Sequence, residues 1–179
     1  MMSIVYVFWM YVVLFAFIGW MRGWAKELLV AFSVILSLAL NHVIRKYIPL
    51  AANLPEADAS LFYVRTIILL VLVYFGYQTV ISIPHLVSRS SAARERLQDT
   101  LFGAFLGALN GYLIAGSVLY YINVTDYSVV QNIISKPTDP ELLQAVNQMM
   151  LYMPPQLLGE PGVYFAIILA FVFVLVVYI

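Results

Sequence analysis

Three charged residues interrupt the first 48 residues of the chain, which are otherwise almost wholly apolar until close to their end. They are Arg22, Lys26 and Glu27. A charge in the middle of a membrane costs about 2.5–3.5 kcal/mol or more on insertion scales. Arg22 and Lys26 would also lie one helical turn apart with the same sign. These charges therefore bear on how the chain crosses the membrane, and we expect the chain to turn back between Gly19 and Glu27.

The neighbouring residues support this turn. Tryptophans favour the interface between membrane and water, and Gly23 permits a sharp backbone reversal. The sequence predicts an interfacial hairpin made of Trp20, Arg22, Gly23, Trp24, Lys26 and Glu27.

Other residues that could do chemistry are few. The chain has no cysteine, which excludes disulfides, thiolate metal sites and thiol catalysis. His42 and His85 are the only histidines. Imidazole is a common ligand of haem and chlorophyll, but nothing pairs these two, and both lie near predicted interfaces. We find no Ser-His-Asp set, no phosphate-binding glycine loop and no paired carboxylates. We therefore expect no catalytic residue, no metal site, no cofactor and no enzyme.

Composition determines the class of protein. Of the 179 residues, 64% are hydrophobic and 10% charged, with a mean hydropathy of +0.95, whereas a soluble domain has about 25% charged residues. The chain is therefore predicted to be an integral membrane protein with lipid as a partner. Nine basic and nine acidic residues cancel, so we expect no nucleic-acid partner.

The apolar runs predict an all-α, polytopic transmembrane helical bundle with a four-span core and a fifth, C-terminal span. A span needs about 20 apolar residues. The first span precedes the hairpin, and a short helix capped by Ser90 or Ser91 is expected before the fourth span. The later spans are predicted at residues 25–48, 61–83 (ended by Pro84), 101–124 and 163–179. This divides the chain into a core (1–124), a polar loop with an amphipathic helix (125–162) and the C-terminal span (163–179).

Basic residues suggest an orientation. The first and third loops hold Arg22, Lys26, Arg89, Arg94 and Arg96, against four basic residues in the second and fourth loops. The positive-inside rule then places the N-terminus outside.

A glycine ridge marks the fourth span. Gly103, Gly107 and Gly111 recur every four residues, with Asn110 beside them. Small residues at this spacing let two helix backbones approach closely in lipid, and the amide can hydrogen-bond across the contact. The ridge could pack on another span of the chain, form a homodimer seam, receive a partner subunit or line a substrate path.

A second helix-packing surface is predicted at residues 139–153. Asp139 suits the N-cap and Pro140 the first helical position. One face is apolar, and we expect it to lie in the interface, to cap the bundle or to receive a partner. That face holds Leu142, Val146, Met149, Met150 and Met153.

Ion-coupled transport is not favoured, because no acidic residue falls inside a predicted span, where transporters usually place one. Glu27 and Asp99 lie at span edges. Arg65 is the one charge drawn slightly inside, and we expect it to reach the loop or to pair with Asp58.

The motifs resemble those of the colicin V production protein (CvpA) family, over roughly Gly19–Val124. "RGWAKELL" at Arg22–Leu29 is similar to that family's hairpin, in which a basic–acidic pair opens the second helix. The spacing of Asp99, Gly103, Gly107 and Gly111 resembles its second motif. Members often carry a basic residue where this chain has Asn110. The resemblance implies a bacterial inner-membrane protein linked to envelope function and to export of a peptide toxin, without a catalytic residue.

Three hypotheses follow. The first is a non-enzymatic accessory or scaffolding subunit that acts through helix packing, with other membrane-protein subunits or a homo-oligomer as partners. The second is a small channel or a component of toxin or peptide export. The third is an accessory subunit of a pigment-containing or electron-transfer complex.

Overall fold

The structure, a computed structural model, describes residues 4–79, 93–134 and 136–178. In these residues the regular structure is helical throughout, which confirms the predicted all-α class. The helices are α1 (Ile4–Arg22), α2 (Trp24–Tyr47), α3 (Pro49–Ala52), α4 (Ala59–Thr79), α5 (Ala93–Val124), α6 (Pro140–Met150), α7 (Pro154–Leu157) and α8 (Gly162–Tyr178).

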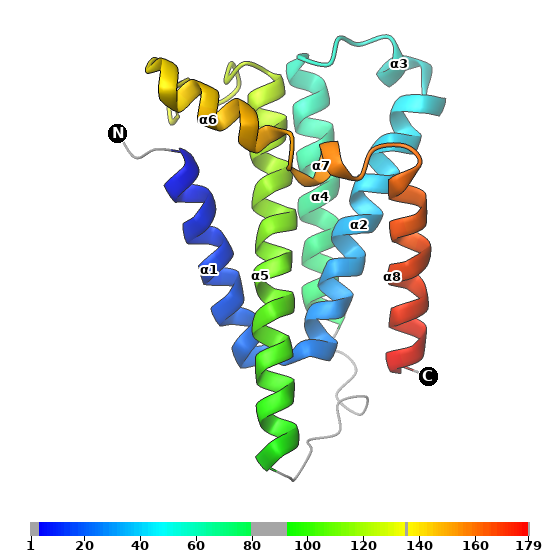
Figure 1. Ribbon diagram of the computed structural model, residues 1–179. Coiled ribbons are helices and arrows are strands. Elements are labelled where there is room, and N and C mark those ends of the chain that lie inside the picture. The colour runs from blue at the N-terminus through cyan, green and yellow to red at the C-terminus, as the bar shows by residue number, and fades with distance from the viewer. Residues whose placement is uncertain (1–3, 80–92, 135, 179) are drawn as a thin grey trace.

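Four of these helices, α1, α2, α4 and α5, are long and apolar enough to cross a membrane. They stand side by side and alternate in direction (Figure 1), which confirms the predicted four-span core. We call the end where α1 meets α2 the Gly23 end, and the opposite end the α6 end. The apolar helix α8 has 17 residues and is shorter than these four, so its role as a fifth span stays a prediction.

The chain reverses at a single residue between α1 and α2. Gly23 has φ +85° and ψ 158°, a conformation that residues with a side chain rarely adopt. A Cβ placed there would also lie 2.7 Å from the Asp99 carboxylate. The turn therefore requires glycine for two reasons, the positive φ angle and the lack of space for a side chain beside Asp99. It lies inside the predicted hairpin.

The fourth span is longer than predicted. The short helix expected before Leu101 is continuous with the span that it was expected to lead into, and α5 runs from Ala93 to Val124 as one helix. No proline interrupts this stretch, so helical hydrogen bonding can continue through Asp99. The proposed caps Ser90 and Ser91, the predicted end of the third span at Ile83–Pro84, and His85 lie outside the described residues.

Helix α2 lies at the centre of the bundle, packed against α4, α5 and α8. Its side chains Val30 and Val34 have no exposed surface, and they meet Leu69 of α4 and Leu113 of α5 in one apolar cluster. Burying side chains of this size stabilises a fold by about 1.5–3 kcal/mol each in water, but within lipid the gain comes from close packing.

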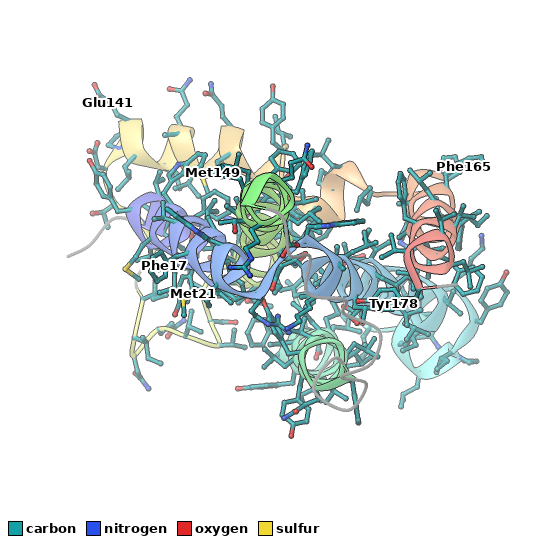
Figure 2. The ribbon with its side chains drawn as sticks, turned by 90° about the horizontal axis from the view of Figure 1, so that it is seen from below. Phe17, Met21, Glu141, Met149, Phe165 and Tyr178 are labelled. Atoms are coloured by element: carbon teal, nitrogen blue, oxygen red, sulfur yellow. The ribbon has the colours of Figure 1, made fainter. Side chains whose placement is uncertain are left out.

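Helix α6 crosses the bundle over α1 and α5 (Figure 1). Asp139 accepts a hydrogen bond from the amide of Glu141 at 3.2 Å and so caps its first turn. Of the predicted apolar face, Val146 and Met150 are buried. Figure 2 shows Met149 directed toward the bundle and Glu141 away from it.

The helix ends at Met150, earlier than the predicted Met153. Met153, directly before Pro154, has extended geometry, as a residue that precedes proline usually does. Met153 is nevertheless buried, and its sulfur lies against Gly116 of α5. The amphipathic segment therefore packs on its own bundle.

The glycine ridge of α5 faces α1 of the same chain. A Cβ added to Gly107 would lie 2.9 Å from the Cα of Gly19, and one added to Gly111 would lie 3.0 Å from the Cα of Val12. Gly103 is in contact with the carbonyl oxygen of Gly19. The two backbones touch along the ridge, and no side chain fits between them.

This contact predicts a large effect of one methyl group. Gly107→Ala should force α1 and α5 apart and lower the unfolding free energy by about 1–3 kcal/mol, the usual cost of overpacking. Thermal unfolding in detergent measures it. The matched control is Gly162→Ala, since a Cβ there would meet nothing closer than 3.8 Å. Equal midpoints for the two variants would show that the ridge contact is not tight.

Candidate functional site

The site lies at the Gly23 end of the bundle and centres on Glu27. This residue is in the first turn of α2 and has no exposed surface. The N-terminus of a helix favours a negative charge, but full burial of a carboxylate needs direct partners as well. Arg22, the last residue of α1, provides one, with its Nη1 at 2.8 Å from Glu27 Oε1.

Asn110 of α5 provides the second partner. Its Nδ2 donates to Glu27 Oε2 at 2.8 Å and to the backbone carbonyl oxygen of Glu27 at 2.9 Å. Asn110 is also fully buried. Both carboxylate oxygens are thus bound, one by an arginine and one by an amide. Asn110 was expected to hydrogen-bond across the ridge, but the ridge faces α1, and the amide instead reaches the carboxylate on α2.

Tyr77 of α4 completes the site. The guanidinium carbon of Arg22 lies 4.2 Å from the centre of the Tyr77 ring, and Arg22 Nη2 is 3.4 Å from the Tyr77 carbonyl oxygen. A cation over an aromatic face gains about 0.5–2 kcal/mol. The Arg22–Glu27–Asn110–Tyr77 network therefore joins all four long helices. We call it the polar network.

Two atoms of the polar network are without a hydrogen bond to any described residue. They are Asn110 Oδ1 and the hydroxyl oxygen of Tyr77, and both are buried. Each has the capacity for one more polar partner.

Asp99 lies beside Gly23, at the start of α2. Its Oδ1 accepts a hydrogen bond from the backbone amide of Trp24 at 3.1 Å, one of the amides that a helix start leaves without a partner. Asp99 comes from α5, so this bond also ties the hairpin to the fourth span.

The predicted hairpin residues differ in how far the protein encloses them. Trp20 and Trp24 are exposed on the bundle, with 57% and 36% of their surface accessible, and Lys26 is half-buried. Glu27, in contrast, is enclosed by protein, with partners from α1 and α5. The interfacial position of the hairpin stays a prediction.

Arg65 reaches back to the loop before α4, which was one of the two expected outcomes. Its Nη2 binds Glu56 Oε2 at 2.9 Å, and Asp58, the other expected partner, accepts from the amide of Ser60 at 2.7 Å. Asp58 stands just before α4, where its Oδ1 caps the helix start. His42 lies at the α6 end, 3.6 Å from Glu160.

The polar network contains one carboxylate, one guanidinium and one amide, which suits structural pairing. In the described ranges no three His, Cys, Asp or Glu residues come together in a way that would hold a metal ion. Sequence reasoning did not find Tyr77, because an aromatic residue among many in an apolar helix gives no signal. The pairing of Arg22 with Glu27 could have been found, since the turn at Gly23 places them on facing helix ends.

The polar network predicts a stability hierarchy. Glu27→Gln leaves the half-buried Arg22 without its counterion and should cost about 3–5 kcal/mol of unfolding free energy, as for other buried pairs. Arg22→Gln should cost a similar amount, and the double variant less than the sum.

Denaturation in mixed detergent micelles measures these differences. Lys136→Gln is the control, because its pair with Asp126 is solvent-exposed at 48% and 72% and should contribute about 0–1 kcal/mol. A Glu27→Gln variant no less stable than Lys136→Gln would contradict the proposed energetics.

Comparison with known proteins adds the family. The model of the family described as "Colicin V production protein" matches residues 4–148. The matched range extends beyond Gly19–Val124 in both directions and includes most of α6 as well as every residue of the polar network. No curated protein and no solved structure matches the chain. With most of its length matched, the chain belongs to the colicin V production protein family.

Proposed function

We propose that this protein is a non-enzymatic accessory or scaffolding subunit of a larger assembly in the bacterial inner membrane. The observation that carries the proposal is the layer of apolar side chains between the two polar ends of the bundle. Val30, Val34 and Leu69 are fully buried in this layer. The polar network lies on one side of it, and the charged residues of the α6 end lie on the other.

This layer argues against the channel alternative. A conducting path needs polar groups or water along its length, whereas α2 presents valines to α4 and α5 at mid-height. The hydroxyls of Ser33 and Ser117 in this region donate to carbonyl oxygens of their own helices at 2.9 and 2.6 Å. These two hydroxyls are therefore satisfied within their own helices.

Helix α1 is the surface we assign to a partner. It is the least buried of the four long helices. In its most apolar stretch 17% of the residues are buried, compared with at least 28% in each of the other three. Trp9 and Phe17 are 57% and 61% exposed on it. Large aromatic side chains often carry most of the binding energy at interfaces. The family description points to colicin V production as the process that the assembly serves.

We further propose that α8 is a fifth span. The hydroxyl of Tyr178 donates to the carbonyl oxygen of Ala25 at 2.8 Å. Near the other end of α8, Glu160 binds Lys46 at 2.9 Å. Because Ala25 and Lys46 lie at opposite ends of α2, α8 covers nearly the same depth as a helix that can cross the membrane. By the positive-inside rule, the Gly23 end faces the cytoplasm and the N-terminus lies outside.

The test is the native mass of the protein extracted from its own membrane in mild detergent, with the absorption spectrum of the same fraction. We expect a defined assembly larger than the chain. Replacing Trp9 and Phe17 by alanine should release the chain from it, since a central interface aromatic contributes about 2 kcal/mol or more.

The matched control replaces Phe165 and Ile168, which are 70% and 62% exposed on α8, and should leave the assembly intact. A chain that runs alone and makes liposomes permeable would overturn the scaffold proposal in favour of a channel. A pigmented fraction would favour the third hypothesis.

A further inference from the structure

A cavity of about 470 Å³ lies at the α6 end of the bundle, far from the polar network. It is bounded by α2, α4 and α5 and by the segment that leads from α7 to α8. Its size lies within the range of small-molecule sites. Its lining is mostly polar and includes Asn41, Arg45, Lys46, Glu56, Arg65 and Glu160.

The charges around the cavity are grouped in two clusters. Glu56 binds Arg45 Nε at 2.8 Å and Arg65 Nη2 at 2.9 Å. Glu160 binds Lys46 at 2.9 Å and lies 3.6 Å from His42. Three permanent cations thus surround two carboxylates, and His42 adds a further positive charge when protonated.

Glu160 keeps its charge in this setting. The hydrogen bonds from Lys46 and from the Tyr164 hydroxyl hold the pKa of Glu160 below its ordinary value. The cavity therefore has a net positive wall that still contains acceptor oxygens. A bare anion would meet two carboxylates, but an anion that also carries hydroxyl groups would find an acceptor for each of them.

Hydrogen-bonding capacity remains unused in the wall. Arg45 Nη1 and Asn41 Oδ1 are both buried, and neither has a hydrogen-bond partner in the part of the chain that the structure describes. A buried guanidinium nitrogen without a partner is costly. Arg45 Nη1 is a donor and Asn41 Oδ1 is an acceptor, and the two residues lie one turn apart on α2. A phosphate oxygen could accept from Arg45, and a hydroxyl could donate to Asn41.

We propose that this cavity binds a polyol phosphate, the chemistry of a glycerol-phosphate group. Arginine and lysine take the phosphate oxygens, and the carboxylates and Asn41 accept from the hydroxyls. The cavity lies where α2 ends at Tyr47 and the chain turns at Pro49, which is the level of lipid headgroups if α2 crosses the membrane. The group can come from an anionic phospholipid such as phosphatidylglycerol or from free glycerol 3-phosphate.

The experiment is thermal unfolding of the purified, delipidated full chain in neutral detergent. Glycerol 3-phosphate is titrated against sodium chloride of equal ionic strength, and phosphatidylglycerol against phosphatidylcholine in mixed micelles. A ligand that binds the folded state raises the midpoint in a saturable way. We expect this for glycerol 3-phosphate, phosphatidylglycerol or both, and not for the two controls.

Asn41→Asp tests the location. It keeps the size of the side chain, and the Tyr121 hydroxyl, which now accepts from Asn41 at 3.3 Å, can donate to the new carboxylate. The added negative charge should weaken ligand binding about tenfold or more. Arg45→Gln is a second variant with the same expected loss. Lys136→Gln, which removes an exposed cation on another segment, should bind as the parent does.

The outcomes separate the sources. Stabilisation by phosphatidylglycerol alone assigns the site to a lipid headgroup, and stabilisation by glycerol 3-phosphate alone assigns it to a soluble ester. Stabilisation by both leaves the shared polyol phosphate as the ligand. No stabilisation by either, or stabilisation that Asn41→Asp and Arg45→Gln leave undiminished, overturns the proposal.

Discussion

The carboxylate of Glu27 has no exposed surface, and the arrangement of the long helices follows from the partners that it needs. Removing a carboxylate from water costs several kcal/mol, which is offset only by well-placed donors. Arg22 and Asn110 supply them from α1 and α5. Asn110 reaches the backbone of Glu27 as well as its side chain, and the glycine ridge of the same helix holds α5 against α1, which carries Arg22. The ridge and the partners of the carboxylate therefore constrain the same three helices.

The same constraint explains why α2 is central. It carries polar side chains near both ends and valines between them, so it is fixed at the Gly23 end by the polar network and at the α6 end by the clusters around Glu56 and Glu160. An apolar helix in lipid can slide or rotate at little cost, because lipid is as apolar as its neighbours. Polar contacts at two levels remove both freedoms. The aromatic contact of Phe32 with Phe171 of α8 then needs only to fit a fixed surface.

Much of the fold was predictable from residue patterns that act locally. Charges inside an apolar run required the turn at Gly23, and Asp139 with Pro140 predicted the start of α6. Contacts that depend on how helices are placed were not predictable. The burial of Glu27 depends on α1 and α5 closing over it. Arg65 was expected to reach the loop or to pair with Asp58, and its contact with Glu56 decides between the two only in the folded chain. The cavity joins residues 38 to 160, and no spacing in the sequence relates them.

Asn110 shows how the network is balanced in this chain. A basic residue at this place would put two cations beside one carboxylate. With Asn110 the buried charges of Arg22 and Glu27 cancel, and the amide still donates to both the carboxylate and the backbone. The consequence is that Asn110 Oδ1 has no partner among the described residues, whereas a cationic side chain would have no acceptor to satisfy. The chain thus exchanges a buried excess charge for a single unpaired oxygen, which is the smaller penalty.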